Sequence, residues 1–199
     1  AMEAGCEVMS IITGRGKRAI TDHFDISYEL EHQIEGSSKE KMLTEIRDII
    51  EKCTFTYTRQ NEMKGLGDAI YKGNVLVGDH NPFAVILADD LCDNKDKSVL
   101  SQMTKLYEQN PDCCIVAIEE VPKEETSKYG VISGVEIEKN LFKINDMVEK
   151  PEPKDAPSNL AIIGRYILIP EIFDVIENTQ PGKNNEVQIT DALLTLAKQ

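Results

Sequence analysis

The chain has 199 residues and a formal net charge of −13, with 41% hydrophobic and 29% charged residues. This length supports one sizeable hydrophobic core, and we expect a single domain over residues 1–199. The negative charge argues against nucleic acid and anionic membranes as partners, and no apolar run approaches the length of a membrane span. Any phosphate-bearing ligand must be met locally by basic side chains, backbone amides or a metal.

Short apolar or β-branched runs alternate with helical patterns through the first part of the chain. The runs predict strands at residues 7–13, 54–58, 83–87 and 114–118. Helical spacing and turn residues predict helices at residues 17–24, 28–34, 68–77 and 98–109, and a longer one that Ser38 caps ahead of Met42, Ile46, Ile49 and Ile50. Strands and helices alternating across short turns indicate an α/β fold with a mostly parallel sheet.

From Tyr129 onward, strands follow one another with little helix between them. We expect strands at residues 131–135, 141–144 and 162–169, then a helix opened by Pro170 and a last helix at residues 187–196. This rhythm indicates a small antiparallel excursion beside the parallel sheet.

Cysteine and histidine patterns exclude several kinds of site. The five cysteines are odd in number and form no CxxC spacing, so zinc and thioredoxin-like sites are excluded. We expect five reduced thiols, mostly buried in strands, in a cytoplasmic protein. His23, His32 and His80 lie in no nucleophile motif, and we expect them on the solvated surface.

The segment Gly14-Arg15-Gly16 stands between a predicted strand and a predicted helix and matches the GxGxx(G/A) dinucleotide pattern. That fingerprint also requires an acidic residue at the end of the next strand, about 20 residues on. Here the next strand lies much farther along the chain, beyond a helical insertion. An ordinary strand-to-helix turn with a basic surface is the better interpretation.

A polar, glycine-bearing loop at residues 60–67 follows a predicted strand and precedes a helix. Ligands gather beyond the carboxyl ends of strands in such sheets. The Gln60 amide offers a donor and an acceptor to a pyrimidine edge, and Gly65 and Gly67 let the backbone approach a flat base closely. A simple glycine-rich turn explains the loop equally well.

Asp89 and Asp90 end an apolar strand that we expect to be buried on both faces. Alternation along a strand sends two consecutive side chains in opposite directions, so one carboxylate can face the ligand crevice. A carboxylate there suits Mg²⁺, which binds through a few carboxylates together with waters and phosphate oxygens. A strand-end turn or a helix cap explains the pair equally well.

The triplet Glu149-Lys150-Pro151 sets an acid and a base side by side and stops the strand with a proline. A glutamate accepts hydroxyl hydrogen bonds through two oxygens, and a lysine holds a phosphate as a point charge. At a strand end, the pair can grip a phosphorylated sugar from two sides. For an isolated dipeptide, a surface Glu-Lys pair before a loop is the simpler interpretation.

The order of these motifs carries more weight than any one of them. Further along the chain stand Lys128-Tyr129-Gly130, then residues 156–166 with Ser158-Asn159-Leu160-Ala161 and Gly164-Arg165-Tyr166, then residues 185–192. The ordered set resembles bacterial UTP–glucose-1-phosphate uridylyltransferases over essentially the whole chain. The resemblance implies a Rossmann-like nucleotide-diphospho-sugar transferase sandwich that makes UDP-glucose and pyrophosphate from UTP and glucose 1-phosphate with Mg²⁺.

The resemblance also implies a role for each matching position. Lys150 would hold the sugar phosphate and Asp89 would ligate Mg²⁺, and these two would be the catalytic residues. Gln60 and the Gly65 backbone would read uracil, and Asp90 would act indirectly. The residues that would bind the sugar are Tyr129, Gly130, Glu149, Asn159 and Tyr166.

Two features of the family have no match in this chain. One is the Gly-rich loop with Gly-Thr-Arg and a downstream Pro-Lys-Glu, and the other is a second metal-binding aspartate in an Asp-Cys-Gly stretch. We therefore expect an internal fragment with little or no turnover of its own. A related sugar-1-phosphate thymidylyltransferase and a non-catalytic sugar-nucleotide-binding fragment remain as alternatives, and a homo-oligomer is possible.

Overall fold

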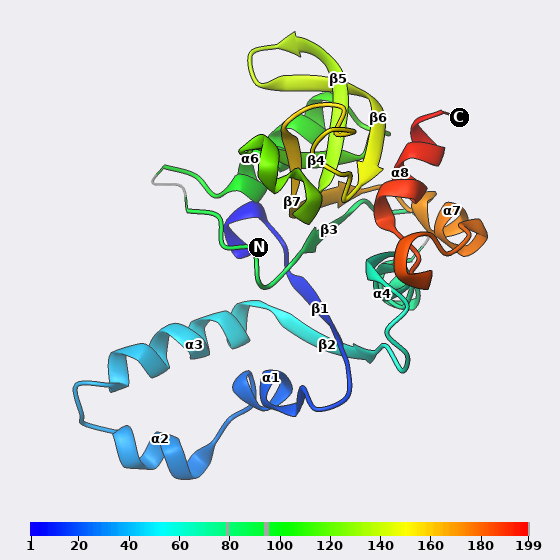
Figure 1. Ribbon diagram of the computed structural model, residues 1–199. Coiled ribbons are helices and arrows are strands. Elements are labelled where there is room, and N and C mark those ends of the chain that lie inside the picture. Colours follow the sequence, from blue (N-terminus) through cyan, green and yellow to red (C-terminus); the bar gives the residue numbers. More distant parts are fainter. Residues whose placement is uncertain (79, 94–95, 199) are drawn as a thin grey trace. The chain divides into compact units, whose positions relative to one another are not determined.

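The computed structural model describes residues 1–78, 80–93 and 96–198 of the chain (Figure 1). Contacts divide it into two compact units, Ala1–Glu62 and Met63–Gln199. The single domain expected from the sequence stays a prediction. Within these described ranges, no helix combines the length and the apolar character needed to cross a membrane.

The first unit is built on a pair of parallel strands. β1 (Val8–Thr13) pairs with β2 (Thr54–Arg59), with Val8 opposite Thr54 and Thr13 opposite Arg59. The aromatic ring of Phe55 in β2 stacks on Phe24, with ring centroids 4.4 Å apart. The helical segments of this unit are η1 (Met2–Ala4), α1 (Arg18–His23), α2 (Tyr28–Ile34) and α3 (Glu40–Lys52).

The helices of the first unit form where the sequence predicts them, but the expected cap of α3 is wrong. α3 begins at Glu40, and Ser38 makes no capping hydrogen bond. The hydroxyl of the preceding residue, Ser37, accepts a hydrogen bond from the Lys39 amide at 3.2 Å, and a Glu40 carboxylate oxygen accepts one from the Gly36 amide at 3.1 Å. Because Ser37 and Ser38 are adjacent and alike, the sequence does not show which of them makes the hydrogen bond ahead of the helix.

The second unit contains a five-stranded sheet in which every described pairing is antiparallel. The prediction of a mostly parallel sheet is therefore wrong for this unit, and among the described strands only β1 and β2 pair in parallel. Apolar runs indicate a buried strand but do not show which strand lies beside it, or in which direction. The strands are β3 (Phe83–Ile86), β4 (Ile115–Glu120), β5 (Gly130–Glu138), β6 (Leu141–Glu149) and β7 (Leu160–Leu168).

β7 lies at the centre of this sheet. Tyr166 of β7 pairs with Val85 of β3 and with Val116 of β4, so β3 and β4 flank β7 on opposite edges. Nearer its start, Ala161 pairs with residues of β4 and of β5. One edge of β7 is thus covered by β4, and β3 and β5 share the other. β6 follows β5 through a two-residue turn.

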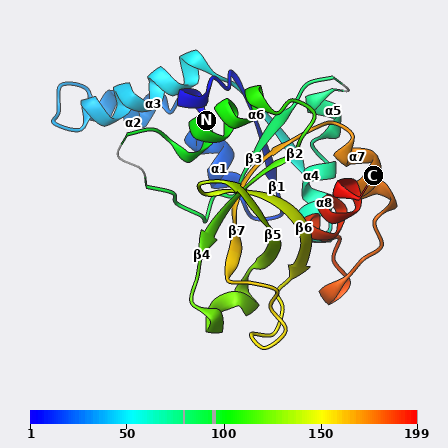
Figure 2. The ribbon, with the colours of Figure 1, turned by 90° about the horizontal axis from the view of Figure 1, so that it is seen from above.

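Helices cover this sheet and create the main core. Ile132 of β5, Leu168 of β7 and Ile172 of α7 are fully buried in one cluster, and the ring of Phe83 stacks on that of Phe173 with centroids 4.9 Å apart. α4, α7 and α8 group together beside the sheet, apart from α6 (Figure 2). The helical segments are α4 (Leu66–Tyr71), α5 (Asn74–Val77), α6 (Val99–Gln109), η2 (Lys123–Lys128), α7 (Ile172–Asn178), η3 (Lys183–Asn185) and α8 (Ile189–Ala197).

Two smaller expectations need correction. The helix expected at residues 68–77 is divided into α4 and α5 at Gly73, whose amide instead closes a tight turn onto the Ile70 carbonyl at 2.9 Å. All five cysteines are free thiols, as expected, but only Cys53 is buried. Cys113 is exposed because it precedes β4 rather than lying inside it.

Candidate active site

One pocket in the second unit collects most of the residues that the sequence singled out. Its volume is about 480 Å³, and it opens among the end of β3, the start of β5, the end of β6, the middle of β7 and the start of α8. It is lined by Leu66, Leu87, Asp89, Asp90, Lys128, Tyr129, Gly130, Glu149, Lys150, Ile162, Gly164, Tyr166, Glu186, Gln188, Ile189 and Thr190.

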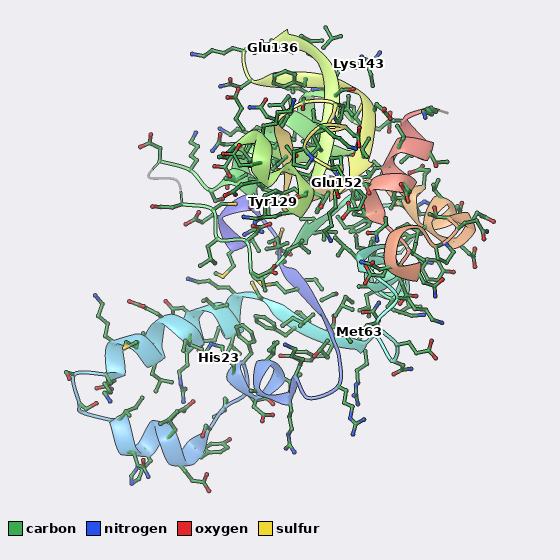
Figure 3. All side chains as sticks on the ribbon, in the orientation of Figure 1. His23, Met63, Tyr129, Glu136, Lys143 and Glu152 are labelled. Atoms are coloured by element: carbon green, nitrogen blue, oxygen red, sulfur yellow. The ribbon has the colours of Figure 1, made fainter. Side chains whose placement is uncertain are left out.

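Six of the nine predicted site residues line this pocket: Asp89, Tyr129, Gly130, Glu149, Lys150 and Tyr166. Tyr129 lies where the chain enters β5, and the outer end of the β5–β6 hairpin, marked by Glu136 and Lys143, points away from it (Figure 3).

The other three predicted residues lie elsewhere. Asn159 is exposed just before β7, where its carbonyl accepts a hydrogen bond from the Val121 amide at 3.0 Å. Gly65 precedes α4, next to the pocket-lining Leu66. Gln60 follows β2 in the first unit, and its backbone N–H donates a hydrogen bond to the Thr13 carbonyl at 2.9 Å. The three histidines are exposed, as expected.

Glu149 and Lys150 form the polar end of β6. The Lys150 ammonium lies 3.4 Å from Glu149 Oε1, and the two side chains are 40% and 16% exposed, respectively. Thr190 Oγ1 donates a hydrogen bond to the other Glu149 oxygen, Oε2, at 3.1 Å. The pair therefore faces a pocket, and Glu149 is held from two sides.

The backbone at Lys150 is strained. Its φ of +46° lies in the left-handed region, which costs a side-chain-bearing residue about 1–2 kcal/mol. The Lys150 amide donates to the Tyr129 carbonyl at 2.9 Å, and the buried Pro151 follows. Non-glycine residues in this region cluster at functional sites, where the surrounding structure enforces them.

Gly130 leaves no space for a side chain at the floor of the pocket. A Cβ there would lie 2.7 Å from Thr190 Cγ2, 3.2 Å from Glu149 Oε2 and 3.3 Å from Ile162 Cδ1. The backbone of β5 can therefore lie close against the residues that hold Glu149.

Tyr166 and Asp191 are titratable groups affected by Glu149. Burial, and then the Glu149 and Asp90 carboxylates, raise the pKa of Tyr166, so its phenol stays protonated and can donate a hydrogen bond. Burial, and then Glu149, raise the pKa of Asp191, which follows Thr190 in α8. The negative charge around Glu149 thus favours a ligand that brings hydrogen-bond donors.

The loop at residues 64–67 is anchored to the segment that leads into α8. The Val187 amide donates to the Lys64 carbonyl at 2.7 Å, and the Gly67 amide donates to the Val187 carbonyl at 2.9 Å. Gly65 has a φ of +95°, and a Cβ there would lie 2.8 Å from the Val187 carbonyl oxygen. The glycines of this loop are thus explained by close packing, whether or not the loop also contacts a ligand.

β3 ends at Ile86 and is only partly buried, so the prediction that Asp89 and Asp90 end a strand buried on both faces is wrong. Both aspartates lie after the strand and line the pocket. Asp89 is exposed, whereas Asp90 is half-buried and its Oδ2 accepts a hydrogen bond from the Gly164 amide at 2.7 Å. Among the described residues, no three His, Cys, Asp or Glu side chains are arranged to hold a metal. One exposed carboxylate beside a ligand pocket still fits Mg²⁺, which commonly binds through one or two carboxylates and completes its shell with waters and phosphate oxygens.

Thr190 and Gln188 are site residues for which we predicted no role. They are 2% and 6% exposed, respectively, and both line the pocket at the start of α8. Buried polar groups need partners, but the burial of these two side chains is visible only in the structure, so the sequence carried no signal that could have found them. Lys128 adds a second cation to the pocket, 3.4 Å from Glu125.

The comparisons with known proteins agree with this geometry. Residues 2–199 match the family model described as nucleotidyl transferase, so the chain has the fold of a nucleotidyl transferase. A UTP–glucose-1-phosphate uridylyltransferase of Pseudomonas aeruginosa is 64% identical over the whole chain, which spans 71% of that relative's length. The chain belongs to the family of UTP–glucose-1-phosphate uridylyltransferases.

Two solved structures of this family carry ligands. A UDP-glucose pyrophosphorylase complexed with UDP-glucose superimposes with a TM-score of 0.91 at 61% identity, covering 99% of this chain and 71% of its own. A UTP-bound enzyme from Acinetobacter baumannii superimposes with a TM-score of 0.85 at 32% identity, covering 100% of this chain and 68% of its own.

Proposed function

We propose that the pocket is the sugar-nucleotide site of a UTP–glucose-1-phosphate uridylyltransferase, which makes UDP-glucose and pyrophosphate from UTP and glucose 1-phosphate. The observation that carries this proposal is the meeting of Asp89, Glu149 and Lys150 in one pocket, although Asp89 follows β3 and the other two stand at the end of β6. The relatives whose structures contain UDP-glucose and UTP support the choice of ligands.

In this proposal, Glu149 and the backbone at Gly130 bind the hydroxyls of glucose. Glu149 Oε2 already accepts the Thr190 hydroxyl, and each carboxylate oxygen has capacity for a further donor. The protonated Tyr166 phenol and Tyr129 line the same pocket. Asn159 is not among the pocket-lining residues, so it would affect sugar binding indirectly, by holding the start of β7.

Lys150 would hold the phosphate next to the sugar. Its ammonium offers three donors and lies 3.4 Å from the Glu149 carboxylate, and both residues line the pocket. Because the chain carries a net charge of −13, local cations have to offset the charge of an incoming phosphate, and Lys128 is a second cation at this position.

Asp89 would hold Mg²⁺ together with phosphate oxygens of the nucleotide. When bound, Mg²⁺ neutralises negative charge that develops on the phosphates during transfer. The backbone at Gly65 would read the uracil ring, and the uracil-reading role of Gln60, which belongs to the first unit, stays a prediction.

The proposed chemistry is in-line attack by the phosphate oxygen of glucose 1-phosphate on the α-phosphorus of UTP, with pyrophosphate as the leaving group. A new P–O bond forms to the sugar phosphate as the bond to pyrophosphate breaks, and no covalent intermediate with the protein is needed. The pocket contributes alignment of the two reactants and neutralisation of charge, which are the main terms in transfers of this kind.

Several expectations remain part of the proposal. They are a Rossmann-like sandwich as the full architecture, one domain over residues 1–199, a cytoplasmic location and a homo-oligomer. The weak turnover expected of these 199 residues belongs here too.

The test is calorimetric titration of the chain with UDP-glucose, with and without Mg²⁺, alongside dTDP-glucose and UDP. We expect UDP-glucose to bind, Glu149→Gln to weaken it, and Glu152→Gln, on the exposed turn after Pro151, to leave it unchanged. Tighter binding of dTDP-glucose than of UDP-glucose would favour the thymidylyl alternative. Equal binding of UDP and UDP-glucose would show that the sugar is not read.

A further inference from the structure

Arg165 is a buried cation of the second unit that the proposed chemistry does not use. It lies in the middle of β7, next to Gly164 and Tyr166, and is only 9% exposed. A guanidinium in such a place needs hydrogen-bond acceptors for its fixed set of donors, since an unsatisfied buried charge costs several kcal/mol.

The acceptors of Arg165 are main-chain carbonyls on both sides of Asp89. Its Nη1 donates to the Leu87 carbonyl at 2.9 Å and to the Gly164 carbonyl at 2.8 Å, and its Nη2 donates to the Asp90 carbonyl. The planar guanidinium thus holds the backbone at Leu87, before Asp89, and at Asp90, directly after it.

A second connection between β7 and the same loop comes from Gly164. Its amide donates to Asp90 Oδ2 at 2.7 Å, and its carbonyl accepts a hydrogen bond from the Leu87 amide at 2.8 Å. A Cβ at Gly164 would lie 2.5 Å from Leu87 Cβ and 2.7 Å from Asp90 Oδ2, so the loop lies against the strand with no space between them.

Leu87, Asp89 and Asp90 of this loop all line the pocket, and the contacts to β7 leave the Asp89 side chain exposed there. The backbone on either side is fastened to β7, the central strand of the sheet, while the Asp89 carboxylate is exposed. Groups that hold a metal ligand in place commonly affect metal affinity by about 10- to 100-fold when they are removed.

We propose that Arg165 is a positioning residue that holds the loop at residues 87–90, and through it the Asp89 carboxylate, in the geometry needed to bind a divalent cation beside the ligand. This inference rests on the proposed role of Asp89. Arg165 is not among the residues that line the pocket, and it acts through backbone carbonyls. A lysine keeps the charge at this position but lacks the planar fork that reaches carbonyls on both sides of Asp89.

The experiment measures Mn²⁺ binding by water-proton relaxation in the presence of saturating UDP-glucose, and UDP-glucose binding by calorimetry in EDTA. For Arg165→Lys, we expect the Mn²⁺ dissociation constant to rise about 10- to 100-fold. UDP-glucose affinity in EDTA should stay unchanged. Unchanged Mn²⁺ binding in folded Arg165→Lys overturns the proposal, and so does an equal loss of UDP-glucose affinity in EDTA.

Two further variants distinguish the role of Arg165 from the role of Asp89 on which it rests. Asp89→Asn should abolish the Mn²⁺ site, and if Mn²⁺ still binds, the role of Asp89 itself is wrong. Ser158→Ala is the matched control, because Ser158 Oγ bonds the Ile132 carbonyl and the Leu160 amide at the other end of the β7 region. Ser158→Ala should lower the unfolding midpoint without changing Mn²⁺ binding. A weaker Mn²⁺ affinity in Ser158→Ala would mean that any destabilisation of β7 weakens Mn²⁺ binding, which contradicts a specific role of Arg165.

If the Arg165 variants do not fold, the Asp90 connection decides the question. Asp90→Ala removes the acceptor of the Gly164 amide, whereas Asp90→Asn removes the charge and keeps an acceptor oxygen. The proposal requires weaker Mn²⁺ binding in Asp90→Ala than in Asp90→Asn, and equal binding in the two overturns it.

Discussion

The Thr190 hydroxyl donates a hydrogen bond to Glu149 Oε2 across 3.1 Å, although the two residues are 41 positions apart in the chain. Thr190 is 2% exposed, so this bond is protected from water and fixes the glutamate rotamer. The other oxygen, Oε1, lies beside the Lys150 ammonium. Glu149 is thus oriented before a ligand arrives, which reduces the entropy that binding has to overcome.

Thr190→Val keeps the shape of this side chain and removes its hydroxyl. Because Glu149 then loses its fixed rotamer, we expect UDP-glucose to bind about 1 kcal/mol more weakly, roughly a fivefold change in Kd, measured by calorimetry. Thr195→Val, on the same helix, is the control. Its hydroxyl bonds only the Asp191 carbonyl on the exposed side of α8, so affinity should not change.

Lys150→Ala removes the ammonium proposed to hold the phosphate. Hydrogen bonds to charged groups contribute about 1.5–3 kcal/mol, so UDP-glucose affinity should fall roughly 10- to 100-fold. The exposed Lys154, four residues on, is the control, and Lys154→Ala should bind UDP-glucose like the wild type. Equal affinity in Lys150→Ala and Lys154→Ala would remove Lys150 from the site.

The left-handed backbone at Lys150 makes a separate prediction about stability. Lys150→Gly relieves the strain at φ +46°, whereas Lys150→Ala retains it. We expect the glycine variant to be more stable than the alanine variant by about 1 kcal/mol in urea unfolding. The same two substitutions at Lys154, which has no positive φ, should rank in the opposite order because glycine there only adds entropy to the unfolded chain.

Gly130→Ala would force a methyl group to within 2.7 Å of Thr190 Cγ2. Because Thr190 is buried and holds Glu149, we expect a loss of about 1–3 kcal/mol in unfolding free energy together with weaker UDP-glucose binding. Gly14→Ala is the control for the substitution itself, since a Cβ at Gly14 meets no atom within 4 Å. A Gly130→Ala variant as stable as Gly14→Ala would contradict the packing at this strand.

Asp191 predicts a dependence of stability on pH. Its pKa is raised above the ordinary 3.8 by burial and by Glu149, so the folded protein binds this proton more tightly than the unfolded chain does. The stabilising contribution is complete below 3.8 and is lost as the pH rises through the raised value. Asp191→Asn removes that loss.

Urea midpoints measured at pH 4 and at pH 7 test this prediction. The gain in stability of Asp191→Asn over the wild type should be larger at pH 7. Asp155→Asn, at an exposed turn position, should show no such growth with pH. A gain for Asp191→Asn that is the same at both pH values would mean that Asp191 titrates alike in the folded and unfolded chain.

The sequence located the elements well because each carries a local signal. Residues 28–34 and 98–109 have helical spacing, and the strand around Val85 is an uninterrupted apolar run. The partners of those strands carry no such signal. Nothing in residues 160–168 shows that this strand enters between β3 and β4, so the sheet direction was predicted wrongly.

The site divides in the same way. Glu149, Lys150 and Asp89 were recognisable from their places in an ordered set of motifs, since each of them alone has a simple local explanation. Thr190 gave no comparable signal, since a threonine near a helix start is ordinary, and its importance comes from a contact with a distant strand. Asn159 illustrates the opposite case, because its place in a motif did not bring it into the pocket lining.

The central place of β7 has a consequence for the order in which the protein is made. β3, β4 and the β5–β6 hairpin all leave the ribosome before Leu168, yet the first two meet only through β7. Until β7 emerges, the edges of β3, β4 and β5 that pair with β7 have no partner in the five-stranded sheet. Unpaired strand edges of this kind are prone to aggregation. The nine-residue strand β7 (Leu160–Leu168) is therefore the last strand to join the sheet. Asp89 and Glu149 can line one pocket only after β7 has paired with its neighbours.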